Sequence, residues 1–193
     1  MDGVSIAARG AVYSVVVAHQ GPLAEIQSIE LDPASETSVV LLQLLLREKK
    51  LGAQISRKRT GSDPRQARLL IGDQAIRFRA EHGKNFAYWD LGQAWVRLTD
   101  LPFVFALWLI RAEVTNPVAI ATELRRLLRR NLAHVEDLAA SQNEVPRNFC
   151  QQYYTEHLSF DLAADEKGGL REFHRRCLTN SIAVTREFKP EFV

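Results

Sequence analysis

The sequence predicts an α/β fold in which strands and helices alternate over the first hundred residues and helices dominate the rest. Three observations predict it: short apolar and β-branched runs, a long apolar helical run at 39–50, and a second helical run beginning at Asn116. A chain of 193 residues is long enough for one large or two small domains. Its 46% hydrophobic and 25% charged residues are typical of globular proteins.

The first two strands are expected at 11–18 and 25–31. Residues 11–18, AVYSVVVA, are apolar almost throughout, which is typical of a parallel strand covered on both faces. Residues 25–31 alternate polar with apolar side chains before Asp32-Pro33, which indicates a strand with one exposed face.

A helix is expected over the apolar run at 39–50. Ser35 or Thr37 can cap its N-terminus, its last turn is basic, and Gly52 follows it. Further strands are expected at 53–59, 67–71, 85–90 and 101–110, with a short helix at 74–81. This alternation predicts parallel βαβ units.

The chain from Asn116 onward is expected to be helical. Pro117 is suited to open a helix, whose apolar face consists of Ile120, Leu124, Leu127, Leu128, Leu132 and Val135. Breaks are expected at Pro146, Gly168 and Gly169. Between them, aromatic contacts are expected from Phe149, Tyr153, Tyr154, Phe160 and Phe173.

Composition argues against several classes of protein. A net charge of +2 with short basic clusters does not favour a nucleic-acid partner. Cys150 and Cys177 lack further ligands at zinc spacing, so we expect free thiols and no metal or cofactor. The five histidines are expected in surface or partly buried structural positions. Without a signal sequence or a membrane-length apolar run, a cytoplasmic protein with no membrane contact is expected.

Four segments together carry a resemblance to a known family. They are Trp89-Asp90-Leu91-Gly92-Gln93-Ala94-Trp95, Leu101-Pro102-Phe103-Val104-Phe105-Ala106, Ser35-Glu36-Thr37-Ser38-Val39 and Leu70-Ile71-Gly72-Asp73. In their order along the chain they resemble the chorismate dehydratases of the futalosine route to menaquinone, where the counterpart of Trp89–Trp95 forms a turn. The resemblance covers about Ala11 to about Glu136.

The resemblance implies a two-lobed fold similar to the type II periplasmic binding proteins, with the ligand held between two α/β lobes. Residues 11–100 would form the second lobe, and 101–193 a return strand and C-terminal helices of the first lobe. The family's opening strand has no counterpart before Ala11, so the fold is expected to be incomplete. Three explanations for the missing strand are open, in this order of preference: a fragment of a longer gene product, a misassigned start methionine, or a shortened relative that has lost activity. Helices after Asn116 would then expose apolar faces, which leaves a homodimer open.

The same resemblance implies where a dicarboxylate substrate, chorismate, would bind. Ser35, Thr37 and Ser38 stand where a helix N-terminus would hold an anion, although they also fit simple capping. Ser14 matches a family serine, or is a core residue whose hydroxyl bonds a carbonyl. Gly72 and Asp73 follow a buried strand, where α/β sheets bind ligands, although Asp73 also fits an N-cap. Phe103 and Phe105 are expected in the core.

The function implied is a carbon-oxygen lyase that dehydrates chorismate to 3-[(1-carboxyvinyl)oxy]benzoate. The sequence assigns no catalytic residue, because the family's opening motif is absent. The alternatives are the related 1,4-dihydroxy-6-naphthoate synthase, a non-catalytic protein that binds a small carboxylate, and an inactive truncated relative.

Overall fold

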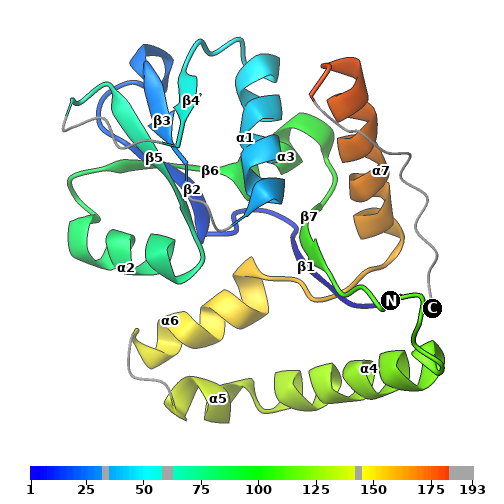
Figure 1. Ribbon diagram of the computed structural model, residues 1–193. Coiled ribbons are helices and arrows are strands. Elements are labelled where there is room, and N and C mark those ends of the chain that lie inside the picture. The colour runs from blue at the N-terminus through cyan, green and yellow to red at the C-terminus, as the bar shows by residue number, and fades with distance from the viewer. Residues whose placement is uncertain (32–34, 58–62, 142–144, 183–193) are drawn as a thin grey trace.

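The structure, a computed structural model, describes residues 1–31, 35–57, 63–141 and 145–182. It contains a five-stranded sheet, a two-stranded ribbon and helices around both (Figure 1). The predicted Asp32-Pro33 turn and the last residues of the strand expected at 53–59 lie outside the described residues.

The five-stranded sheet is mixed, with strand order β4-β3-β5-β2-β6. Its strands are β2 (Val15–His19), β3 (Ser28–Glu30), β4 (Gln54–Ser56), β5 (Gln66–Ile71) and β6 (Ala87–Asp90). Strand β3 runs parallel to β4 and β5, whereas β2 runs antiparallel to β5 and β6. The predicted parallel unit is present where α1 connects β3 to β4, but a parallel direction for β2 was wrong, because the apolar composition of β2 reflects burial on both faces and not strand direction.

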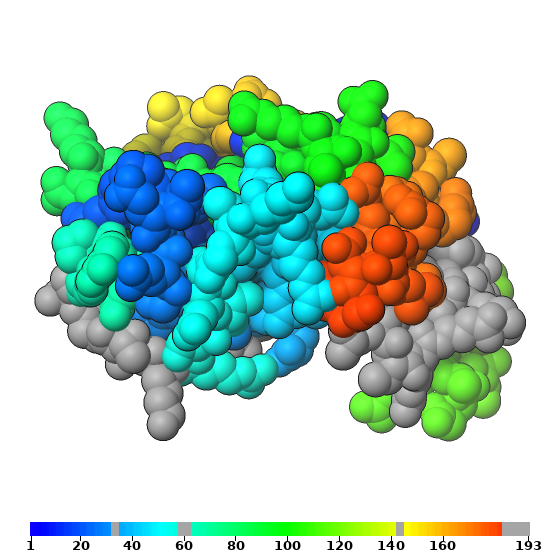
Figure 2. Space-filling view, turned by 90° about the horizontal axis from the view of Figure 1, so that it is seen from above, coloured from blue at the N-terminus to red at the C-terminus, as the bar shows by residue number. Residues whose placement is uncertain are grey.

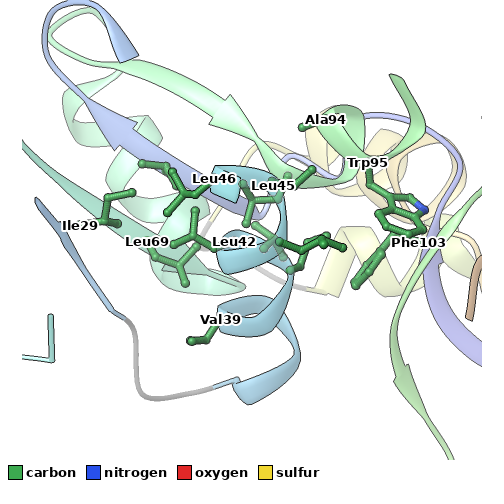
Figure 3. Close-up of a cluster of buried hydrophobic side chains, with 14 of the residues drawn as sticks. Ile29, Val39, Leu42, Leu45, Leu46, Leu69, Ala94, Trp95 and Phe103 are labelled. Carbon is green, nitrogen blue, oxygen red and sulfur yellow. The ribbon is translucent and has the colours of Figure 1, made fainter. Parts of the chain in front are cut away.

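Helices cover both faces of this sheet. Helices α1 (Glu36–Glu48) and α3 (Leu91–Thr99) bury the larger core, in which Leu42, Leu45 and Trp95 are almost fully enclosed (Figure 3). Helix α2 (Asp73–His82) covers a smaller cluster on Val16 and Leu70. The predicted α1 and α2 are confirmed, but after α1 the left-handed residue is Lys50 (φ 54°) and not Gly52.

The two-stranded ribbon pairs β1 (Ser5–Ala8) antiparallel with β7 (Phe103–Leu107). The other edge of β1 bonds to the chain at 159–161, since the Ala7 and Ser159 backbones exchange two hydrogen bonds of 2.8 Å. Strand β1 was not predicted from the sequence. Its four residues, SIAA, are too short and too small to stand out as a strand.

Helix α7 (Ala164–Thr179) packs on this ribbon. Phe173 of α7 contacts Trp95 and Phe103 at ring-centroid distances of 5.8 and 4.9 Å, and Phe103 is buried as expected. The break predicted at Gly168 and Gly169 was wrong, since both lie inside α7. Gly169 is there for close packing: a Cβ on it would overlap the carbonyl oxygen of Pro102.

The remaining helices form a separate arm below the sheet in Figure 1. They are α4 (Pro117–Ala133), α5 (Val135–Ser141), α6 (Arg147–Gln152) and the π-helical turn η2 (Tyr153–His157). Asn116 caps α4 and Pro117 opens it, as predicted. Leu124 and Leu128 pack on Met1 and Val4, whereas other apolar side chains of the arm stay exposed as expected, namely Val118, Ile120, Leu132 and Leu138.

Candidate functional site

One edge of the five-stranded sheet gathers the residues that the sequence singled out. Val15 pairs with Ile71 and Val16 with Asp90, so Ser14, Gly72 and the end of β6 lie together. Strand β3 is parallel to its neighbour β5, so the chain leaves β3 toward α1 at this same edge. We call it the carboxyl edge, because β3, β5 and β6 all end there.

Ser14 is buried at this edge and links two distant parts of the chain. Its hydroxyl accepts a 2.7 Å hydrogen bond from Tyr153 Oη of η2, and its carbonyl accepts one of 2.7 Å from the Gly72 N–H. The partner of the Ser14 hydroxyl is thus a phenol and not the carbonyl that the core interpretation expected. Burial raises the pKa of Tyr153, so its hydroxyl keeps its proton at neutral pH.

The chain entering β2 is held by the carboxylate of Asp90. Asp90 Oδ2 accepts from the Tyr13 N–H at 2.7 Å, and Oδ1 accepts from the N–H groups of Val12 and Gln93 at 3.1 and 2.9 Å. Tyr13 has a left-handed backbone (φ 67°), a conformation that costs energy for a bulky residue. Asp90 is the N-cap of α3, so the family-like segment that begins at Trp89 opens a helix and not a turn.

The N-terminus of α1 carries the three predicted hydroxyl residues. Ser35 is the N-cap, accepting from the Ser38 N–H at 3.2 Å, and its hydroxyl donates to Ser38 Oγ at 3.1 Å. Ser38 is fully buried, while Thr37 is half-buried and is not the cap. Capping by Ser35 is confirmed; a binding role for the three residues stays a prediction.

Gly72 and Asp73 join β5 to α2. Gly72 is the N-cap residue of α2 with φ 62° and ψ −135°, a backbone conformation suited to glycine. Asp73 is the exposed first residue of the helix, so the N-cap interpretation of Asp73 was wrong. Burial is the largest cause of the raised pKa values of Tyr153 and Tyr154, and the negative charge of Asp73 adds to both.

An aromatic cluster that sequence reasoning did not assign to a site joins this edge to the arm. The Tyr13 ring lies 4.8 Å from the Phe149 ring and 5.5 Å from the His157 ring. The Arg79 guanidinium lies 4.0 Å from the centre of the Tyr13 ring. Phe149 and Tyr153 were expected only as packing contacts, because their distance in the sequence gave no sign that Phe149 meets Tyr13 and Tyr153 meets Ser14.

Other features of the described chain lie away from this edge. A hollow of about 1000 Å³ opens at the opposite edge, where β3, β4 and β5 begin; its lining includes Ser28, Gln54 and Arg65. Ligands of α/β sheets bind beyond the carboxyl ends of strands, which favours the carboxyl edge. Cys150 and Cys177 are free and buried. His19, expected in a surface or partly buried structural position, is buried, with Nδ1 2.9 Å from the Gly21 carbonyl.

Within the parts that the structure describes, no three His, Cys, Asp or Glu side chains gather as metal ligands. None of the helices described there is long and apolar enough to cross a membrane.

Comparison with known proteins tests the family resemblance carried by the four sequence segments. A protein-family model described as menaquinone biosynthesis matches residues 1–179. The chain belongs to this menaquinone biosynthesis family. The match extends beyond the resemblance from Ala11 to Glu136, since it includes β1 and the whole of α7. The family assignment made from the four segments is therefore confirmed.

One protein of known activity and one solved structure are similar to this chain. A chorismate dehydratase of Thermus thermophilus is 32% identical over 188 residues, which cover 88% of this chain and 69% of that protein. A crystal structure of a protein from Archaeoglobus fulgidus matches with a TM-score of 0.65 at 16% identity, covering 94% of this chain and 72% of that one. That likeness supports the fold alone, and the α/β fold similar to periplasmic binding proteins is confirmed.

Proposed function

We propose that this chain acts as a chorismate dehydratase, with chorismate bound at the carboxyl edge of the five-stranded sheet. The observation that carries the proposal is the meeting of Ser14, Gly72 and Tyr153 at the edge that the family resemblance pointed to. The identity of 32% to the Thermus thermophilus chorismate dehydratase supports the same reaction.

The reaction asks for orientation more than for strong acid–base chemistry. Chorismate loses one ring proton and its ring hydroxyl as water, and the ring becomes aromatic, which supplies much of the driving force. The site has to hold two carboxylates and the leaving hydroxyl in place. In our proposal the N-terminus of α1, with Ser35 and Ser38, holds one carboxylate, since free N–H groups and the helix dipole favour an anion.

The second group in the proposal is the pair of hydroxyls of Ser14 and Tyr153. Because burial raises the pKa of Tyr153, its phenol remains a hydrogen-bond donor at the pH of the cell. Asp73, the first residue of α2, would orient a substrate hydroxyl. No side chain is assigned as proton acceptor, because a substrate carboxylate held near the ring proton serves as well.

The test is turnover of chorismate by the purified chain. We expect loss of chorismate and formation of 3-[(1-carboxyvinyl)oxy]benzoate, separated by liquid chromatography and identified by mass. Ser14→Ala should lower kcat/KM by roughly tenfold or more, since it removes one hydroxyl and leaves that of Tyr153 unpaired. Ser28→Ala makes the same change at the opposite edge and should leave turnover unchanged.

Two results would argue against the proposal. Binding of chorismate without product would favour the protein that only binds a small carboxylate. Turnover of the naphthoate synthase substrate in place of chorismate would favour the related enzyme of the same route.

A further inference from the structure

Arg79 of α2 packs against aromatic rings and has no carboxylate partner among the residues that the structure describes. Its guanidinium lies between two phenol rings, 4.0 Å from the centre of Tyr13 and 4.4 Å from that of Tyr88. In the part of the chain that the structure describes, no carboxylate lies within ion-pair distance of Arg79, and its Nε is buried without a hydrogen-bond partner.

The phenol of Tyr88 has the same deficit. Its Oη is buried and has no hydrogen-bond partner among the described residues. The two unpaired groups belong to side chains in contact, because the Arg79 guanidinium lies 4.4 Å from the centre of the Tyr88 ring. Leaving a buried polar atom unpaired is costly, and two neighbouring ones indicate a ligand that pairs with both.

The position of this pair relative to the carboxyl edge is fixed by Tyr13. Tyr13 precedes Ser14 directly, and its strained backbone is held by Asp90. Strained residues persist where the surrounding structure enforces them and often mark binding sites. Here the residue with the left-handed backbone is the one whose ring lies 4.0 Å from the guanidinium of Arg79.

We propose that Arg79 and Tyr88 form a carboxylate-binding subsite next to Ser14. A planar guanidinium presents paired N–H donors that match a carboxylate, and the Tyr88 hydroxyl would donate a third hydrogen bond. The subsite takes the second carboxylate of the substrate, the first being held at α1. This step rests on the proposed function, but the recognition of a carboxylate by Arg79 is testable by itself.

The test measures binding of benzoate, a simple aromatic carboxylate, by calorimetry, with neutral benzamide as the matched control. Wild-type protein should bind benzoate and not benzamide. Arg79→Met and Tyr88→Phe should each weaken benzoate binding, Arg79→Met by roughly tenfold or more. Arg77→Met removes an exposed charge from the same helix and should bind benzoate as the wild type does.

Thermal unfolding separates a binding role from a structural one. Tyr88→Phe deletes an unpaired buried hydroxyl, so it should leave the melting temperature unchanged or raise it while benzoate binding falls. Unchanged benzoate binding in folded Arg79→Met and Tyr88→Phe proteins would overturn the subsite. A wild type that binds benzoate but does not turn over chorismate would instead contradict the dehydratase proposal and leave the subsite standing.

Discussion

At the scale of single residues, two neighbouring glycines in α7 differ in how much space surrounds them for a side chain. Gly168 and Gly169 are neighbours in the same helix and were both expected to break it. A Cβ on Gly168 would make an ordinary 3.7 Å contact with Leu101, whereas one on Gly169 would overlap the Pro102 carbonyl oxygen. Only the second is required by packing.

We therefore expect Gly169→Ala to destabilise the protein by about 1 to 3 kcal/mol, because β7 must shift away from α7 to make room. Gly168→Ala should be neutral or stabilising by up to about 1 kcal/mol, since alanine favours a helix over glycine. The free energy of unfolding, measured by denaturant titration, checks both. Equal effects of the two substitutions would contradict the close contact.

At the scale of elements, an ion-pair network links helix α7 to helix α1. Arg176 of α7 donates to Glu172 at 2.6 Å and reaches Glu48 of α1 at 2.8 Å. Figure 2 shows α7 lying against α1. This ion-pair network connects the ribbon side of the molecule to a helix of the five-stranded sheet, and it is only partly exposed.

The network makes a prediction about acid stability. The hydrogen bond from Arg175, together with that from Arg176, lowers the pKa of Glu172 to about 2. A carboxylate whose pKa falls on folding stabilises the native state above its unfolded pKa, about 4.3, and this contribution is lost as the pH falls toward 2.

Glu172→Gln should accordingly be less stable than the wild type at pH 7, and the difference should shrink as the pH is lowered from about 5 to about 2. Urea unfolding across this pH range measures it. Glu123→Gln disrupts a fully exposed pair with Arg126 within α4 and should change stability little at any pH. A difference for Glu172→Gln that is independent of pH would speak against the network.

At the scale of the whole molecule, the sequence predicted the element types well and their assembly less well. Local signals were sufficient for α1, α2 and α4, because capping residues and apolar spacing act within one helix. The direction of β2 was predicted wrongly, because its apolar composition reflects burial on both faces. Strand β1 was missed, because its pairing partner β7 lies about a hundred residues away in the chain.

The candidate site divides in the same way. Ser14, Ser35, Gly72 and Asp73 could be named from motifs. Antiparallel pairing of β2 with β5 brings Ser14 to Gly72, and parallel pairing of β3 with β5 brings the start of α1 to the same edge. Arg79, Tyr88 and Tyr153 could not, since their importance comes from tertiary contacts: a cation between two rings, and a phenol that reaches Ser14. Nothing in the spacing of these residues distinguishes them from ordinary packing side chains.

The central claim is that chorismate binds at the carboxyl edge, and amide chemical-shift mapping by NMR tests it most directly. On titration with chorismate we predict the largest shifts at Ser14, at Gly72 and in the first turn of α1. The N–H groups there either face the proposed ligand or bond to residues that do. Shifts confined to Gln54 and Arg65, around the hollow at the opposite edge, would contradict the claim.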